Sequence, residues 1–428
     1  MPDRRSYVLP AELATPLVAR TRPEDFRVEE IPAYEPSGEG EHTLLDIEKR
    51  GIATNEAVRR LARVLHVPPR EFGHAGMKDA RAVTRQRISV RGVDPERVRG
   101  LTTHGVRVLA ALRHGNKLQP GHLAGNRFVL VLRGIEDGAL DKVRRGLAIL
   151  AEKGVPHWFD AQRFGNRGDT GDIGIALLFG DWREAIELIC GRASERDYGA
   201  VLEARELFDA GRLAESARAW PRSYREPRVI QESLLRDPQG LREALWRLEA
   251  TSLRLYASAA QSQLFNRVLA ARMPELGRLV DGDLVQFETS RGRFVVEDTA
   301  AEQPRADAFE ISPTGPLFGD KEQRPRGVAL ALEEQVLRDA GVRREQFARR
   351  GPFYCSGSRR PLRLRAREAT VEEAVDDLGR HLVLRFELPS GGYATNVLAE
   401  LGQERLRIVE RDEDLADPAP AERGEAPA

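Results

Sequence analysis

The two ends of this 428-residue chain carry strand patterns, whereas its middle is polar and helical. Near the N-terminus, residues 45–47 alternate apolar and polar side chains, and residues 128–132 (FVLVL) form a short apolar run typical of a buried strand. Extended patterns return in residues 362–365 and 382–388, after an Arg- and Glu-rich stretch from about 190 to 250. Because two chain halves can build one sheet, the pattern predicts an α+β protein with an inserted domain.

Shorter signals place individual elements. Thr54 is predicted to cap a helix that ends before Pro68-Pro69. Residues 75–86 are predicted to form a loop, and a probable hairpin spans residues 283–297. A last helix is expected to begin near Ala394.

Composition excludes several classes of protein. The chain is 41% hydrophobic and 31% charged, as expected for a soluble globular protein, and no run approaches the ~18 apolar residues of a membrane span. Its start, MPDRRSYVLP, lacks the apolar core of a secretory signal. Cys190 and Cys355 lie far apart, and the GxxxxGKS/T, HExxH and GxSxG motifs are absent. We therefore expect a cytoplasmic protein with no metal and no cofactor.

Charge is distributed unevenly along the chain, although 67 basic residues balance 67 acidic ones. Residues 51–133 hold 16 Lys or Arg against 5 Asp or Glu, and residues 359–367 contain five arginines. Local basic excess of this kind is the electrostatic footprint of nucleic-acid binding. The tail from 410 to 428 is instead acidic, and residues 413–428 are expected to be disordered.

One carboxylate, Asp79, lies among cations in the stretch GHAGMKDARAVTRQ (73–86), with Lys78 and Arg81 close in sequence. Nearby positive charge favours the ionised acid. An ionised carboxylate can attack an electron-poor carbon while the cations hold a polyanion. By itself the stretch fits an ordinary surface ion pair as well.

Three aromatic patches could contact a base. Phe26 lies among charges in PEDFRVEE, Asn126 and Phe128 pair an amide with an aromatic near a strand start, and Tyr393 follows Gly391-Gly392. Aromatic rings stack on unpaired bases, and an amide can bond a base edge. Taken separately, core packing and simple turns explain these residues equally well.

Seven segments in one order resemble the TruD family of tRNA pseudouridine synthases. The first three are ARTRPEDFRVEE (19–30), AGMKDARAVTRQ (75–86) and HLAGNRFVLVLR (122–133). The others are HWFDAQRFGNRG (157–168), SAAQSQLFN (258–266), PTGPLFG (313–319) and LPSGGYATNVLAELG (388–402). The resemblance covers nearly the whole chain, apart from the tail and a stretch near 190–250 that looks expanded.

The resemblance implies a cofactor-free isomerase that converts a tRNA uridine, uridine 13 of the D arm, to pseudouridine. It implies a pseudouridine synthase catalytic domain with a mixed or antiparallel sheet, formed by residues 1–157 and 362–412. A family-specific α+β domain, residues 158–361, would be inserted between them. The partner would be tRNA, whose phosphates would be held by the stripe from Arg81 to Arg133 and by the five arginines of residues 359–367. No membrane contact and no obligate protein partner are implied, and we expect a monomer.

The resemblance also implies roles for single residues. Asp79 matches the catalytic carboxylate; it could add to C1′, add to the uracil ring or abstract the 2′ proton. Arg20 matches a position usually held by Lys, so either Arg20 or Lys78 could pair with Asp79, and both count as substrate-binding residues. Lys78 could instead contact a phosphate. Further residues match substrate-binding positions or are expected to shape the cleft: Phe26, Asn126, Phe128, Arg163 and Tyr393.

Two other functional classes stay open at this point. A noncatalytic RNA-binding or RNA-chaperone protein would keep the basic stretches without needing Asp79. A hydrolase could use Asp79 with Glu29 or Glu30 as a carboxylate pair on a glycosidic bond. A hydrolase would release free uracil, whereas an isomerase conserves mass.

Overall fold

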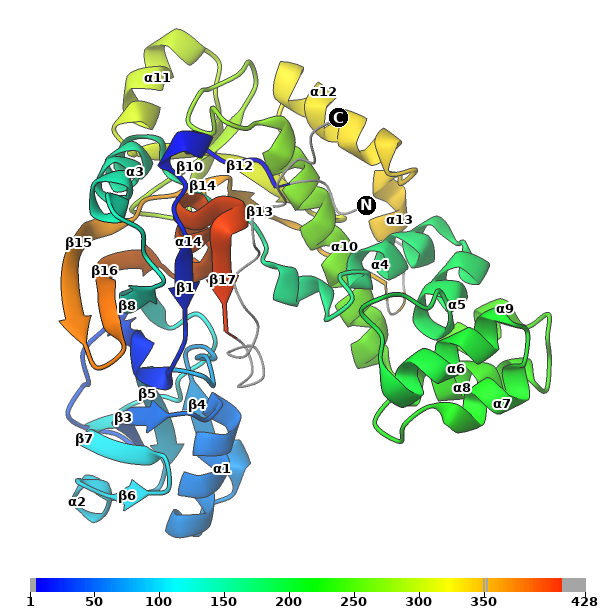
Figure 1. The fold of residues 1–428 in the computed structure, drawn as a ribbon, viewed down its shortest axis with the longest axis horizontal. Helices are drawn as coiled ribbons and strands as arrows, with labels where there is room; N and C mark the ends of the chain where they lie inside the picture. Colours follow the sequence, from blue (N-terminus) through cyan, green and yellow to red (C-terminus); the bar gives the residue numbers. More distant parts are fainter. Residues whose placement is uncertain (1–4, 349–350, 352, 410–428) are drawn as a thin grey trace. The chain divides into compact units, whose positions relative to one another are not determined.

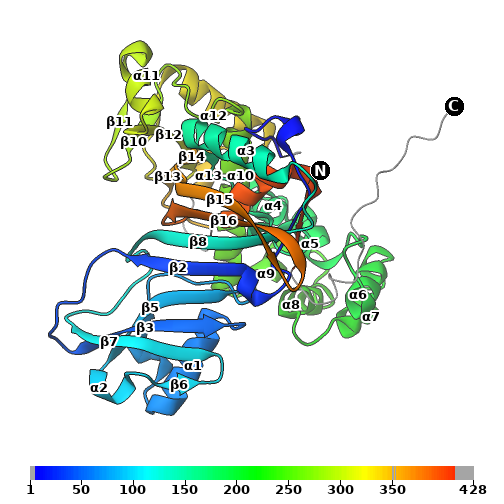
Figure 2. The same ribbon diagram turned by 60° about the vertical axis from the view of Figure 1, so that its left-hand side comes forward.

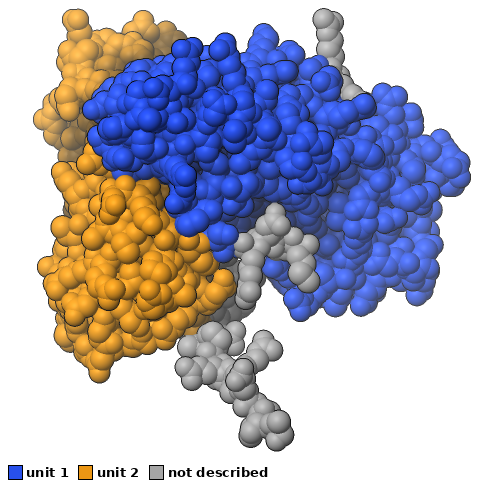
Figure 3. Space-filling view, turned by 90° about the horizontal axis from the view of Figure 1, so that it is seen from above, with its two compact units in different colours: residues 1–6, 156–363 blue, residues 7–155, 364–428 orange. Residues whose placement is uncertain are grey.

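The computed structural model describes residues 5–348, 351 and 353–409. The chain divides into two compact units, coloured separately in Figure 3. The sheet unit contains residues 7–155 and 364–428, and the inserted unit contains residues 1–6 and 156–363. The domain boundaries predicted at 157/158 and 361/362 stay predictions, and the acidic tail predicted to be disordered lies outside the described residues.

The sheet unit is built on one mixed 11-stranded sheet, with strand order β15-β16-β8-β2-β5-β3-β7-β6 and three short strands beside this path (Figure 2). Its strands are β1 (Leu17–Ala19), β2 (Phe26–Pro32), β3 (His42–Arg50), β4 (Phe72–His74), β5 (Val83–Arg91), β6 (Thr102–Thr103), β7 (Val106–His114), β8 (Leu123–Arg133), β15 (Arg367–Asp376), β16 (Gly379–Pro389) and β17 (Leu406–Ile408). β16 pairs antiparallel with β8, so Phe386 lies opposite Phe128. Both chain ends therefore contribute to one sheet, as the strand patterns predicted.

Four α-helices accompany the sheet: α1 (Thr54–Leu65), α2 (Pro95–Val98), α3 (Ala139–Lys153) and α14 (Ala394–Gly402). The turns η1 (Ala11–Leu13), η2 (Pro23–Asp25), η3 (Pro69–Glu71) and η5 (Gln403–Arg405) are 3-10 helices. α1 buries Leu61 and Leu65 against Leu45, Ile47 and Ile88 of β3 and β5. This apolar layer fixes which face of β3 is turned to the interior.

One local prediction was wrong. Thr54 does not cap α1, because Ala53 holds the N-cap position and no side chain caps it. The Thr54 hydroxyl instead accepts the backbone N–H of Lys78 at 3.0 Å and donates to the Gln86 amide oxygen at 2.9 Å. A buried hydroxyl satisfies its hydrogen bonds wherever the fold offers partners, and here one partner lies in the loop before β5 and the other in β5 itself.

The inserted unit is mainly helical (Figure 1). Its helices are η4 (Ala161–Phe164), α4 (Thr170–Phe179), α5 (Trp182–Cys190), α6 (Gly199–Asp209), α7 (Leu213–Ala219), α8 (Arg225–Leu234), α9 (Leu241–Trp246), α10 (Ala250–Ala271), α11 (Thr299–Asp307), α12 (Gly327–Asp339) and α13 (Arg344–Phe347). α10 crosses α4 so closely that a side chain at Gly174 would meet the Tyr256 carbonyl. The helical prediction for residues 190–250 is confirmed.

A four-stranded sheet completes the inserted unit, in the order β11-β10-β12-β13. Its strands are β10 (Leu284–Phe287), β11 (Arg293–Val295), β12 (Ile311–Leu317) and β13 (Ser358–Pro361), and β10 and β11 form the predicted hairpin. The chain passes between the units within two short strands, β9 (Val155–Pro156) and β14 (Arg363–Leu364). Helices and sheets together confirm the α+β class. Among the described residues, no helix is long and apolar enough to span a membrane.

Candidate active site

An ion pair between Arg20 and Asp79 lies at the centre of the site, with 3.1 Å between Arg20 Nη2 and Asp79 Oδ1. Arg20 is the residue that follows β1, and Asp79 lies in the loop between β4 and β5. The guanidinium is buried, with 8% of its side chain exposed, whereas 38% of the Asp79 side chain is exposed. The structure thus selects Arg20, rather than Lys78, as the partner of Asp79.

Arg20 is held on several sides. Its backbone adopts a left-handed conformation, with φ of 64°, which is uncommon for a residue other than glycine. Its guanidinium lies 4.2 Å from the centre of the Phe26 ring. Arg81, two residues after Asp79, donates to the carbonyls of Arg20 and Thr21 at 3.1 Å each. The loop that carries Asp79 therefore also binds the backbone of Arg20, the residue that pairs with Asp79.

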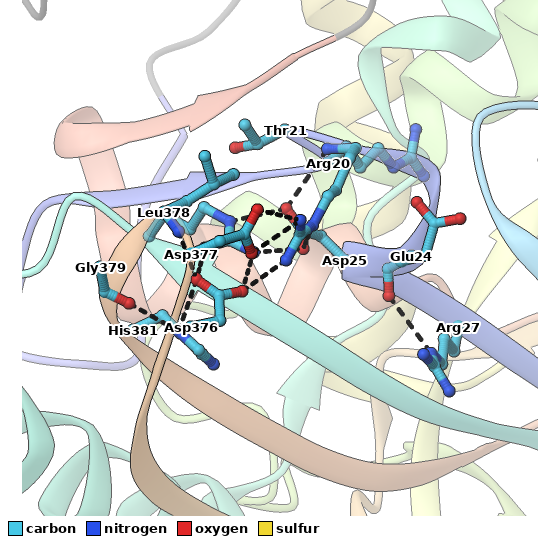
Figure 4. Close-up of polar contacts among 12 residues, drawn as sticks. Arg20, Thr21, Glu24, Asp25, Arg27, Asp376, Asp377, Leu378, Gly379 and His381 are labelled. Atoms are coloured by element: carbon cyan, nitrogen blue, oxygen red, sulfur yellow. Dashed lines mark hydrogen bonds and ion pairs between the residues drawn. The ribbon is translucent and has the colours of Figure 1, made fainter.

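A second ion-pair network anchors the segment that follows Arg20 (Figure 4). Arg133 of β8 forms paired bonds of 2.7–2.9 Å with both oxygens of Asp25 and of Asp376. Hydrogen bonding to Asp25 and Asp376 raises the pKa of Arg133, and the Arg133 guanidinium holds the pKa of Asp376 well below its usual range. Arg22 adds bonds of 3.1 and 3.2 Å to Asp377.

Lys78 points away from solvent into a buried ion pair with Glu30. Its ammonium lies 2.7 Å from Glu30 Oε2, and the two side chains are 5% and 2% exposed. The other Glu30 oxygen accepts the backbone N–H of Arg87 at 3.2 Å. These contacts do not favour the phosphate contact that the sequence allowed for Lys78. They also occupy both oxygens of Glu30, while Glu29, the other hydrolase candidate, is exposed near Arg127.

Two of the predicted aromatic residues, Phe26 and Phe128, form a row with Phe386 inside the sheet unit. Phe26 meets Phe128 edge to face at 6.4 Å, and Phe128 stacks on Phe386 at 5.2 Å. All three rings are buried, so neither Phe26 nor Phe128 offers an open face for stacking. Phe26, held in place by Phe128, packs against the Arg20 guanidinium.

Two further predicted residues are Asn126, with a buried amide, and Tyr393, with a partly exposed ring. Asn126 lies opposite Glu30 of β2 and Leu388 of β16, and its buried Oδ1 has no hydrogen-bond partner among the described residues. Tyr393 precedes α14 and is 41% exposed. Arg163 belongs to the inserted unit, where it donates to the hydroxyls of Ser258 and Ser262.

The arginine-rich stretch before β15 divides into interior and surface residues. Arg359 is buried beside Glu333 at 2.7 Å, and Arg363 is buried as well. Arg365 and Arg367 are exposed. The expectation that all five arginines hold phosphates is therefore wrong for the buried ones, because a side chain enclosed by protein cannot reach a polyanion.

Among the described residues, no group of three or more His, Cys, Asp or Glu side chains could hold a metal ion. The site offers a partly exposed carboxylate beside a permanent cation.

Comparisons with known proteins point to one family. The family model described as tRNA pseudouridine synthase D (TruD) matches residues 12–401. The tRNA pseudouridine synthase D of Geobacter sulfurreducens is 45% identical over 402 residues, which cover 93% of this chain and 97% of that protein. The protein of the same name from Anaeromyxobacter sp. is 39% identical, with 92% and 95% covered. The crystal structure of a putative tRNA pseudouridine synthase D from Methanosarcina mazei superimposes with a TM-score of 0.81 at 27% identity, covering 94% of this chain and 96% of that one.

Proposed function

The chain belongs to the tRNA pseudouridine synthase D (TruD) family, and from this premise we propose that it isomerises uridine 13 of the tRNA D arm with Asp79 as its catalytic carboxylate. The reaction breaks the C1′–N1 bond, turns the uracil and joins C5 to C1′. The proton displaced from C5 leaves and N1 gains one, so the atoms of uridine are conserved. The chemistry needs neither an oxidant nor a transferred group.

The observation that carries this proposal is the Arg20–Asp79 ion pair. A guanidinium cannot deprotonate at the pH of a cell, so it is a permanent cation that fixes the direction of the neighbouring carboxylate. Arg20 Nη2 bonds to Oδ1 of Asp79, and part of the carboxylate faces solvent. Attack on C1′, attack on the uracil ring and removal of the 2′ proton are all compatible with this geometry.

The target uridine must leave its stack to reach Asp79. The unpaired Oδ1 of Asn126 is an acceptor suited to the N3–H donor of uracil. Tyr393 offers an exposed ring on which the flipped base can stack. Phe26 and Phe128, which are buried and packed together, do not stack on the base.

The other functional classes predict different products. A noncatalytic RNA-binding protein would bind tRNA and leave it unchanged, and the Arg20–Asp79 pair would serve no purpose in it. A hydrolase needs two carboxylates flanking the bond, but Glu30 is enclosed with Lys78. We therefore favour the isomerase.

The test is the replacement Asp79→Asn, which keeps the shape of the side chain and removes its charge. We expect tRNA affinity close to that of the wild type and loss of pseudouridine, measured as carbodiimide-reactive residues in an unmodified tRNA transcript. Asp137→Asn, at an exposed carboxylate of the same unit, is the matched control and should remain fully active. Appreciable turnover by Asp79→Asn, or release of free uracil by the wild type, would overturn the proposal.

Mapping the reactive residue in the same transcript locates the modified nucleotide. A single carbodiimide-reactive residue, at position 13, is expected. Modification at another position would refute the assigned substrate nucleotide and leave the role of Asp79 standing.

A further inference from the structure

Lys49 is a fully buried lysine, with none of its surface exposed. It lies on β3 two residues after Ile47 and four after Leu45, so all three side chains share the face that packs against α1. Its neighbours across the sheet, Thr84 of β5 and Val106 of β7, are uncharged. The alternation of β3 calls for an apolar residue at this position, and the chain places a cation there.

The ammonium of Lys49 has its three donors matched to three backbone carbonyls. It donates to Ile52 at 2.7 Å, to Lys78 at 3.3 Å and to Asp79 at 2.6 Å. Two of these carbonyls belong to the peptide bonds on either side of Asp79, that of Lys78 before it and that of Asp79 after it. The ammonium thus joins the end of β3 to the loop that carries the carboxylate.

Two charged side chains act on this ammonium. Burial and the positive charge of Lys78 lower the pKa of Lys49 to about 8, against the attraction of Asp79. Lys49 therefore changes charge in a range where the enzyme can be assayed.

We propose that Lys49 is a positioning residue of the isomerisation, whose buried ammonium fixes the backbone at Lys78 and Asp79 and so aims the Asp79 carboxylate. The inference rests on the proposed function of Asp79. Burying a cation is costly, and an apolar residue would pack the same strand position without that cost. What a neutral side chain lacks is the third donor: an uncharged amine has only two N–H groups, so one of the three carbonyls would lose its partner.

Other contacts hold the same loop, but within the described part of the chain none of them reaches the Asp79 carbonyl. Thr54 bonds to the N–H of Lys78, and Gln86 donates to the Gly76 carbonyl at 3.4 Å. Lys49 is the contact closest to the carboxylate along the backbone. A displacement of about 1 Å at a reacting group can reduce a rate about 100-fold.

The first test is Lys49→Met, which keeps a long apolar side chain and removes the charge and the donors. The rate of pseudouridine formation in a single turnover should fall about 100-fold, while the dissociation constant for tRNA stays within a factor of about three of the wild-type value. Thr43→Val is the matched control, because Thr43 is buried on the same strand and donates to the Val93 carbonyl, away from the loop. It should keep the wild-type rate.

The second test is the pH profile of the single-turnover rate, which a purely structural residue would not alter. In the wild type the rate should decline as pH rises through about 8, because Lys49 then loses its proton. Thr43→Val should show the same decline, and Lys49→Met should not. Lys49→Arg, which keeps a permanent charge, should recover part of the rate without the decline.

The outcomes separate the two proposals. A wild-type rate that does not change around pH 8, or a Lys49→Met rate equal to that of Thr43→Val, overturns the role of Lys49 and leaves the isomerase intact. Should Lys49→Met fail to fold, the wild-type profile alone decides. A wild type that forms no pseudouridine from any tRNA instead refutes the proposed function.

Discussion

At the scale of the residue, two neighbours in sequence, Lys78 and Asp79, lie in different surroundings. Lys78 and Asp79 are adjacent, yet the first side chain is enclosed with Glu30 and the second is partly exposed beside Arg20. A buried charge is tolerated only when it is paired and hydrogen-bonded, and Glu30 meets this requirement for Lys78. The cation next to Asp79 in sequence is thus paired with Glu30, while the cation that pairs with Asp79 comes from a segment 59 positions away.

This distinction gives a prediction for Lys78→Met. Removing one partner of a buried pair leaves the Glu30 charge uncompensated, so the free energy of unfolding should fall by about 3–5 kcal/mol. The slope of log Kd for tRNA against log salt should not change, because no phosphate contact is lost. A slope reduced by about 1 would instead assign Lys78 to a phosphate.

The double variant Lys78→Met/Glu30→Gln is the control for that prediction. It removes both charges, so it should recover most of the lost stability in urea denaturation. A double variant as unstable as Lys78→Met would show that the ion pair is not the cause.

At the scale of the element, the segment from β1 to β2 carries the arginine of the site on a backbone fixed from outside. η2 is attached to β8 through Asp25 and Arg133, and to the turn between β15 and β16 through Asp376. Strands from both chain ends thus determine where Arg20 lies. The network is far from Asp79 in sequence, but it limits the movement of the residue that holds Asp79.

Arg133→Met should therefore affect both stability and activity. It removes the buried partner of the Asp25 carboxylate, which then keeps only the longer ion pair with Arg22 at 3.4 Å, at a cost of about 3–5 kcal/mol in the free energy of unfolding at pH 7. The single-turnover rate should fall as well, since the Arg20 segment loses its anchor. Arg22→Met, which removes only the partly exposed arm of the network, should change stability little.

The pH dependence of this difference has a definite sign. Asp376 has a lowered pKa in the folded protein, so its pairing with Arg133 stabilises the fold above the ordinary aspartate pKa of about 4 and is lost as pH falls below it. The stability gap between wild type and Arg133→Met should therefore narrow at acid pH. A gap that is constant from pH 7 down to pH 3 would contradict the assignment.

At the scale of the whole molecule, the net charge is zero, but the cations divide into buried and exposed ones. Arg87 pairs with Asp46 and Arg133 with Asp25, so part of the basic excess of residues 51–133 is neutralised within the fold. Exposed arginines such as Arg365 and Arg367 are better placed to meet a polyanion. Electrostatic binding to tRNA depends on those surface charges, and its strength depends on salt.

The variant Arg365→Ala/Arg367→Ala tests this view. Binding of tRNA should weaken, and the slope of log Kd against log salt should fall by about 1 for each phosphate contact removed. Arg144→Ala, which removes an exposed arginine of α3 paired with Asp141, is the control and should leave the slope unchanged. An unchanged slope in the double variant would exclude both arginines from the tRNA interface.

The sequence by itself determined the elements and the family. The apolar run at residues 128–132 and the alternation at 45–47 identified strands because burial on a sheet face is recorded locally. Seven ordered motifs identified the TruD family, which the comparisons confirm, and with it Asp79 as the residue to test. Thr54 was misassigned as a cap, because its actual partners are 24 and 32 positions away, Lys78 in the loop before β5 and Gln86 in β5.

Only the tertiary structure decided which charges meet. The choice of Arg20 over Lys78, the enclosure of Arg359, and the position of Lys49 under the Asp79 loop all depend on the register of strands that are distant in sequence. The sequence signal for Lys49 is a lysine at an inward position of β3. A charged residue reads the same in a sequence whether it faces water or a buried partner, and the folded chain alone supplies that partner.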